Sequence, residues 1–272
     1  MLALNGKFQN ASWQHNMPAT PSTTTWGTRL TAHATPHSKG VWATLLTTTL
    51  DAYGFWLSIA GTSTAATRTD MLIEVATGPS QENIIIQEMP CGWRATASVS
   101  PYVIWFPIFI PAGTLVSARI QSLITVDTAD VLFYVNGGAI SMPGPLFAGC
   151  DAYGIVTASS QGTSHTPGNT GAESTAANIG STTSRAYGGV MLCVQGTMAI
   201  VVMTSIAYHW ELVIGGTSVC EWRSGGNTSE YNIGPFPPAP FHTSIPESTQ
   251  LQVMAEASGT AQAQDVSFLC FY

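Results

Sequence analysis

The feature that most constrains this sequence is an internal repeat. Residues from Phe106 onward recur in the same order 135 positions later in the chain. The matching residues at this spacing include Phe106, Ile110, Pro111, Thr114, Asp130, Val131 and Phe133, which correspond to Phe241, Ile245, Pro246, Thr249, Asp265, Val266 and Phe268. Self-similarity at a fixed spacing is typical of duplicated structural units. The chain is therefore expected to contain two versions of one domain.

The repeat also sets the domain organisation. Upstream the spacing shifts by a few residues, so that Glu74 corresponds to Glu211. We expect four segments: an extended N-terminal arm (1–25), a first domain (26–137), a connector (138–152) and a second domain (153–272).

Composition and turn spacing predict the fold class. Only 8% of the residues are charged, whereas exposed helix faces normally carry Glu, Lys and Arg. Gly, Pro, Ser and Thr separate short β-rich runs in the first copy at 40–48, 53–60, 71–77, 83–87, 102–110, 115–121 and 131–135. Short, closely spaced strands favour a sandwich or jelly roll. We therefore predict an all-β fold of two tandem, jelly-roll-like β-sandwich domains.

Two segments are apolar on both of their faces. In the last strand, Val266, Phe268, Cys270 and Tyr272 face one way, and Ser267, Leu269 and Phe271 face the other. The run from Tyr102 to Ile110 contains Pro107, which cannot donate to a β-ladder, so this run is predicted at an edge or a bulge. Because free apolar edges aggregate, we expect a neighbouring subunit or the N-terminal arm to cover it.

Charge and cysteine usage exclude several classes of partner. The net charge is −7 and no basic cluster is present, which argues against direct binding of nucleic acid. The five cysteines form no C-x-x-C pair, so they are expected to be small buried thiols of a protein made in a reducing cytoplasm. With so few charges, much of the surface is expected to lie against other subunits. The alternative is a secreted protein rich in Thr and Ser.

No targeting or membrane segment is expected. The N-terminal residues contain no apolar stretch of the length found in signal peptides. The apolar runs at 101–111 and 198–203 are shorter than the roughly 20 residues that a spanning helix needs. We expect a soluble protein that does not interact with membranes.

No motif in the chain points to catalysis. The sequence has no nucleophile elbow, P-loop or dinucleotide-binding motif. None of the six histidines recurs in the second copy, and Pro36 argues against a helix that would join His33 to His37. Glu74 and Glu211 recur, which suits a structural role at a strand end or turn. We expect no enzyme activity, no metal and no cofactor.

The motif Cys-x-Trp-Arg occurs once in each copy. It places Trp93 beside Arg94 and Trp222 beside Arg223, which could form a stacking platform for a sugar or a partner protein. The alternative is that both tryptophans fill the sandwich cores. In the arm, Trp13 is a further candidate contact, if the arm lies across a neighbour rather than forming a disordered tail.

Four motifs resemble virion proteins of tailed bacteriophages. They lie at Thr35 to Gly40, Asp51 to Gly54, Glu74 to Gly78 and Phe106 to Thr114. The second copy departs from this pattern, with Arg185 in place of the aspartate. The resemblance implies a structural virion component, most simply a capsid decoration or cement protein. Its implied partners are the major capsid or tail proteins and copies of itself, with a trimer favoured, and its implied location is the virion, after synthesis in the host cytoplasm.

Two other roles remain open at the level of sequence. One is a tail, collar or fibre protein of the same particle. The other is a carbohydrate-binding or receptor-binding module, which would expose aromatic side chains from loops at one end of each sandwich.

Overall fold

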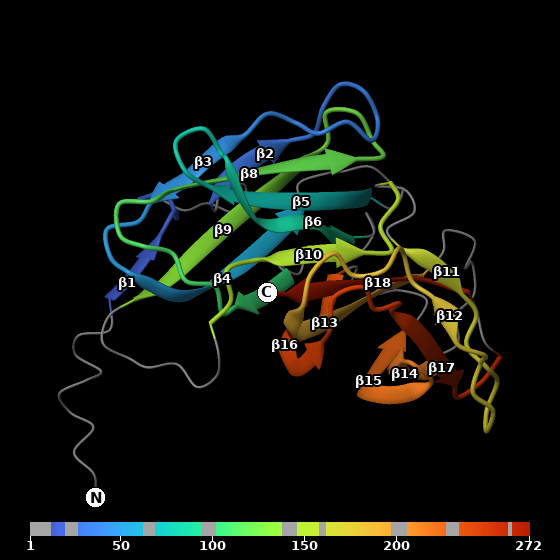
Figure 1. Ribbon diagram of the computed structural model, residues 1–272. Coiled ribbons are helices and arrows are strands. Elements are labelled where there is room, and N and C mark those ends of the chain that lie inside the picture. The colour runs from blue at the N-terminus through green and yellow to red at the C-terminus, as the bar shows by residue number, and fades with distance from the viewer. Residues whose placement is uncertain are drawn as a thin grey trace, which may run out of the picture.

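A computed structural model describes residues 12–19, 27–61, 69–93, 102–137, 146–157, 162–196, 206–226, 234–260 and 263–272. Within these ranges the chain forms eighteen β-strands and no helix. Accordingly, none of the described segments is a helix long and apolar enough to cross a membrane. Figure 1 shows the strands gathered in two neighbouring sandwiches, which confirms the predicted all-β fold.

The first sandwich is a jelly roll. Its strands are β1 (Ser12–His15), β2 (Thr28–Thr31), β3 (Ala43–Thr47), β4 (Ala52–Gly61), β5 (Thr69–Thr77), β6 (Asn83–Trp93), β7 (Tyr102–Phe106), β8 (Leu115–Ser122) and β9 (Thr128–Gly137). In one sheet β1 and β2 pair with two successive parts of β9, and β4 and β7 follow. The opposing sheet has the order β3-β8-β5-β6. From β2 onward, consecutive strands alternate between the two sheets except at the β5–β6 hairpin, as in double-sheet jelly rolls.

The second sandwich repeats this topology strand by strand. Its strands are β10 (Cys150–Tyr153), β11 (Thr163–His165), β12 (Ala177–Asn178), β13 (Tyr187–Gly196), β14 (Ile206–Ile214), β15 (Thr217–Gly226), β16 (Gly234–Ile245), β17 (Gln252–Ala257) and β18 (Gln264–Phe271). Here β10 and β11 pair with β18, and β13 and β16 follow, opposite a sheet of order β12-β17-β14-β15. Each strand therefore corresponds to the one nine places earlier, as the sequence repeat predicts.

The first strand of each jelly roll lies outside the domain range expected from sequence. Strand β1 lies in the predicted arm and pairs with β9, with Ser12 opposite Gly137. Strand β10 spans the end of the predicted connector and pairs with β18, with Cys150 opposite Phe271. At four residues each, these strands are too short to show a clear apolar alternation by which they could be predicted.

Strand β7 bears out the prediction of an edge strand. It ends at Phe106, immediately before Pro107, and it is the last strand of its sheet. Beyond it, Ile110 forms an isolated bridge with Ala52. Proline stops the ladder because it has no N–H to donate.

One continuous sheet joins the two jelly rolls. Strand β10 pairs on one side with β18 and on the other, in parallel, with β6, where Cys150 lies opposite Ile86. The result is a nine-stranded sheet of order β16-β13-β18-β10-β6-β5-β8-β3, with β11 paired to β18. In Figure 1 this sheet runs through both sandwiches, with β10 at the junction.

Strand β18 contributes to two hydrophobic cores. Val266, Phe268 and Cys270 lie in the core of the second jelly roll. Leu269 and Phe271 point the other way, into the core of the first. The predicted alternation is confirmed, and the second apolar face of this strand is covered within the same chain.

The cover over the apolar edge strand also comes from within the chain. The Phe106 ring of β7 lies 6.0 Å from the Phe271 ring of β18, between ring centroids, and Phe147 lies 5.4 Å from Phe271. For this inward side of the run, the cover is not the neighbouring subunit or arm that the sequence analysis expects, while Val103 and Phe109 on the other side remain exposed. The second jelly roll covers the inward side, because β10 places its sheet directly beside β6.

The five cysteines are all buried. Burial raises the pKa of the Cys220 thiol to about 11. The other thiols, such as Cys91, have their pKa raised further by the same cause. A thiol that stays protonated at neutral pH is a poor nucleophile and metal ligand, so these side chains act as small apolar core residues.

Candidate functional site

The two halves of the Cys-x-Trp-Arg motif lie on opposite faces of strand β15. Cys220 and Trp222 point into the second core, where Trp222 is 5% exposed. Arg223 is exposed on the other face. Neighbouring residues of a strand point to opposite sides of the sheet, so Trp222 and Arg223 cannot form one platform. The contact hypothesis for Trp222 is corrected accordingly: its side chain fills the core.

The first copy of the motif falls at the boundary of the described residues. Trp93 is the last residue of β6, and its side chain, like the whole of Arg94, lies outside the described part of the chain. A contact role for these two residues stays a prediction.

Trp13 belongs to a surface that the sequence did not reveal. The outward side of the sheet β1-β9-β4-β7 carries Trp13, His15, Tyr134, Trp56 and Trp105, which we call the aromatic face. Strand register places the last four directly opposite one another across the four strands. The ring centroids of His15 and Tyr134 are 5.4 Å apart, and those of Trp56 and Trp105 are 5.2 Å apart.

Exposure on the aromatic face is greatest at β1 and at the far edge. Trp13 is 56% exposed, and Val103 of β7 is 44% exposed. Between them, Trp56 and Tyr134 are half-buried by their neighbours. The alternate residues Phe55 and Phe133 point into the core and are fully buried. Exposed large apolar side chains beside partly buried rings are the kind of surface that marks an interaction site when they form a patch.

Gly54 shapes one part of the aromatic face. Its φ of +140° is disfavoured for residues with a side chain, and a Cβ there would lie 2.3 Å from the Trp105 ring. Trp105 therefore lies flat over Gly54. Beside it, Asp51 accepts a hydrogen bond of 2.9 Å from the Ala112 N–H. The motif from Asp51 to Gly54 thus joins the strand start to a distant turn and makes room for the buried Trp105 ring.

The corresponding face of the second jelly roll is aliphatic and buried. Strand equivalence places Met191 where Trp56 lies, Leu269 where Tyr134 lies and Cys150 where Trp13 lies. Met191, Leu269 and Cys150 all belong to the core of the first jelly roll. The same sheet face is therefore an internal contact in one copy, whereas in the other it leaves Trp13 and Val103 exposed.

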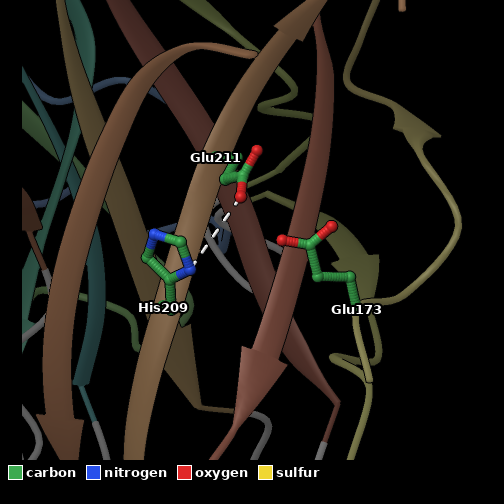
Figure 2. A group of neighbouring side chains, drawn as sticks. All are labelled: Glu173, His209 and Glu211. Atoms are coloured by element: carbon green, nitrogen blue, oxygen red, sulfur yellow. Dashed lines mark ion pairs between the residues drawn. The ribbon is translucent and has the colours of Figure 1, made fainter. Parts of the chain in front are cut away.

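A second group of side chains gathers on the outer face of the sheet β12-β17-β14-β15. Ligand atoms of Glu173, His209 and Glu211 lie within 4.8 Å of one another. Figure 2 shows His209 and Glu211 projecting from one strand, with Glu173 reaching toward them from a neighbouring segment. His209 Nδ1 lies 3.9 Å from Glu211 Oε1, and its Nε2 lies 3.3 Å from Glu221 Oε2.

The carboxyl groups of Glu173 and Glu211 lie in contact within this group. Glu173 hydrogen-bonds with Glu211, and this contact, together with the repulsion between the two charges, raises the pKa of Glu173. These three residues were not predicted to lie together. The available signal was the spacing His209-x-Glu211, since residues two apart in a strand share a face.

The equivalent carboxylate of the first jelly roll has different neighbours. Glu74 accepts from Lys39 Nζ at 2.6 Å and from Arg119 at 2.6 Å, and its side chain is 4% exposed. In the second copy, Met254 stands opposite Glu211 where Arg119 stands opposite Glu74. Glu74 lies inside β5 and not at a strand end, which corrects the position expected for it.

Comparisons with known proteins give no family for this chain. No protein-family model and no curated protein matches it. Among solved structures, PNGF-II is similar over 95% of this chain and 64% of its own, at 6% identity and a TM-score of 0.40. The cowpea mosaic virus top component, an empty particle, is similar over 97% and 89%, at 8% identity and a TM-score of 0.38.

A further similarity is to a tandem pair of domains. The CBM22-1-CBM22-2 tandem domain of Paenibacillus barcinonensis Xyn10C is similar over 98% of this chain and 95% of its own, at 9% identity and a TM-score of 0.27. At TM-scores this low, these similarities do not indicate a function for this chain.

Proposed function

We propose that this chain is a non-enzymatic structural component of a virus particle, in particular a capsid decoration or cement protein of a tailed phage that bridges neighbouring subunits. The observation that carries the proposal is the aromatic face. It presents Trp13 and Val103 to solvent on a sheet whose counterpart in the second copy is a buried contact. A chain with 8% charged residues is expected to cover such a surface with protein.

The fold is compatible with this role by analogy. Jelly rolls with two four-stranded sheets occur in viral capsid proteins, and also in lectins and cupins. Fold alone does not select among these functions. The motifs that resemble tailed-phage virion proteins favour the first, and they map to strand starts and turns such as Asp51 to Gly54 and Phe106 to Thr114.

The direct test is to look for the protein in purified particles and then to remove it. If the chain is a decoration protein, quantitative mass spectrometry should find it in numbers comparable with the major capsid subunit. Particles assembled without it should release their contents at lower temperature, and added protein should restore their stability. A few copies per particle would instead assign it to the tail or collar. Absence from particles would overturn the proposal.

A carbohydrate-binding or receptor-binding module is the second candidate. The exposed Trp13 and His15, with the half-buried Tyr134 and Trp56 beside them, favour it, because flat aromatic surfaces stack on sugar rings as readily as on protein. A glycan-array measurement with wild type and Trp13→Ala would test it. Binding that depends on Trp13 would support this candidate, whereas no binding to any glycan would count against it.

A further inference from the structure

The contact between the two jelly rolls joins an edge of the first to a sheet of the second. The open edge of the first, formed by β6 and β7, receives the sheet of the second. Strand β10 adds to β6 in parallel. The outward face of that incoming sheet then covers the edge of the first core, where Phe271 meets Phe106.

At the corresponding edge of the second jelly roll, no described strand adds to the sheets. Its strands β15 and β16 are each the last of their sheet among the described strands. Phe241 of β16 corresponds to Phe106 at the repeat spacing and is 43% exposed. Its ring centroid lies 6.3 Å from that of Trp222, at the rim of the second core. Exposed edges with apolar side chains are normally covered in stable proteins.

The complementary surface is present on the first jelly roll. Strand β1 corresponds to β10, since both open their jelly roll and pair with the same end of its last strand. Whereas β10 also pairs with β6, β1 pairs with β9 alone among the described strands. The face beside β1 carries exposed Trp13, at the position that Cys150 occupies in the buried contact.

We propose that copies of this chain join head to tail by repeating their own internal contact. The head is the aromatic face with β1, and the tail is the edge formed by β15 and β16. The head of one chain adds to the tail of the next, as β10 and its sheet add to β6 and β7. The inference rests on the proposed function in one respect, namely that the aromatic face is a protein contact surface.

The symmetry of such a contact has a direct consequence. Head and tail are different surfaces, so the interface is heterologous and each chain keeps one of each free for a further copy. Chains therefore add in one direction until the rotation closes a ring. Every jelly roll in that ring would then have the same two neighbours, one linked by the chain and one not.

The test is the solution mass of the full chain by light scattering after size exclusion, over a dilution series. Wild type should form a species of several chains that dissociates on dilution. Trp13→Glu should disable the head and Phe241→Glu the tail, and each should give a single-chain mass. Both side chains are largely exposed, so the fold should persist, as circular dichroism would check. Val41→Glu, at an apolar side chain 81% exposed elsewhere on the surface, is the matched control and should behave as wild type.

Mixing the two disabled variants makes the test specific for direction. Trp13→Glu keeps its tail and Phe241→Glu keeps its head, so the mixture should yield a two-chain complex that contains one of each and grows no further. A mixture that stays single-chain would overturn the head-to-tail arrangement. A single-chain wild type at all concentrations would overturn the inference too, while the particle test above would still decide the proposed function.

Discussion

The outward faces of the two corresponding sheets differ although their strands superpose in order and register. In the first jelly roll the face carries Trp13, Tyr134 and Trp56 toward solvent. In the second, Leu269 and Met191 stand at matching positions and are fully buried. The two copies share one fold, but the residue types on this outward face differ because the face meets different surroundings in each copy. Aliphatic residues suit a permanent internal contact, and aromatic residues suit a surface that meets another molecule.

The largest expected loss of stability comes from a substitution on the buried sheet face of the second jelly roll. Phe271→Ala should lower the free energy of unfolding by about 3–5 kcal/mol, because it leaves a cavity between the two jelly rolls. Urea denaturation would measure it. Trp13→Ala, on the exposed face, should change stability by less than about 1 kcal/mol. Equal losses for the two variants would contradict the distinction between the faces.

The next effect concerns the two corresponding glutamates. Glu74→Gln should cost roughly 2–3 kcal/mol, since it removes the buried charge that holds Lys39 and Arg119. Glu211→Gln removes a like-charge contact with Glu173, and it should leave the free energy of unfolding unchanged or raise it. Thermal melts of both variants at neutral pH would check this. A large loss for Glu211→Gln would mean that the two positions are held alike.

A smaller effect should distinguish two corresponding glycines. Gly54→Ala should cost about 1–2 kcal/mol, because its φ of +140° is strained for alanine and its Cβ would displace the Trp105 ring. Gly188 is its counterpart in the repeat and has no such backbone constraint, with a Cβ 3.1 Å from the Phe147 ring. Gly188→Ala should therefore cost less. Tryptophan fluorescence alongside the melts would report whether Trp105 moves only in the first variant.

The smallest effect is a dependence of stability on pH. The pKa of Glu173 is raised above its ordinary value of 4.5 by its hydrogen bond with Glu211 and by the charges of Glu211 and Glu256, with His209 opposing them. The folded state therefore holds more protons than the unfolded chain just above that pH, and stability falls as pH rises through this interval. Glu211→Gln should flatten the fall. An unchanged pH profile in that variant would show that the contact contributes nothing.

Much of the fold could be predicted because residue patterns in the sequence indicate it directly. The repeat from Phe106 fixed the number of domains, Pro107 marked the end of an edge strand, and the alternation along β18 assigned its two faces. What covers the second face could not be predicted. Apolar residues on both sides of a strand show that both sides are buried, but they do not name the neighbour.

The candidate surface was harder to predict than the fold. Trp13 was identified, but its partners Tyr134, Trp56 and Trp105 lie on strands far apart in sequence and meet only through register. Trp222 was predicted as a contact residue because its Cys-x-Trp-Arg motif occurs twice in the sequence. In the second jelly roll this tryptophan fills the core, and the side chain of Trp93 lies outside the described residues.

The parallel junction between β6 and β10 has a mechanical consequence. A linker between domains acts as a hinge, whereas here the hydrogen-bonded sheet and the shared core cross the boundary without interruption. Bending the two halves against each other would require shearing that ladder and opening apolar surface to water. The angle between the jelly rolls is therefore a fixed property of the fold, and any shell or ring built from this chain would inherit its curvature from that angle.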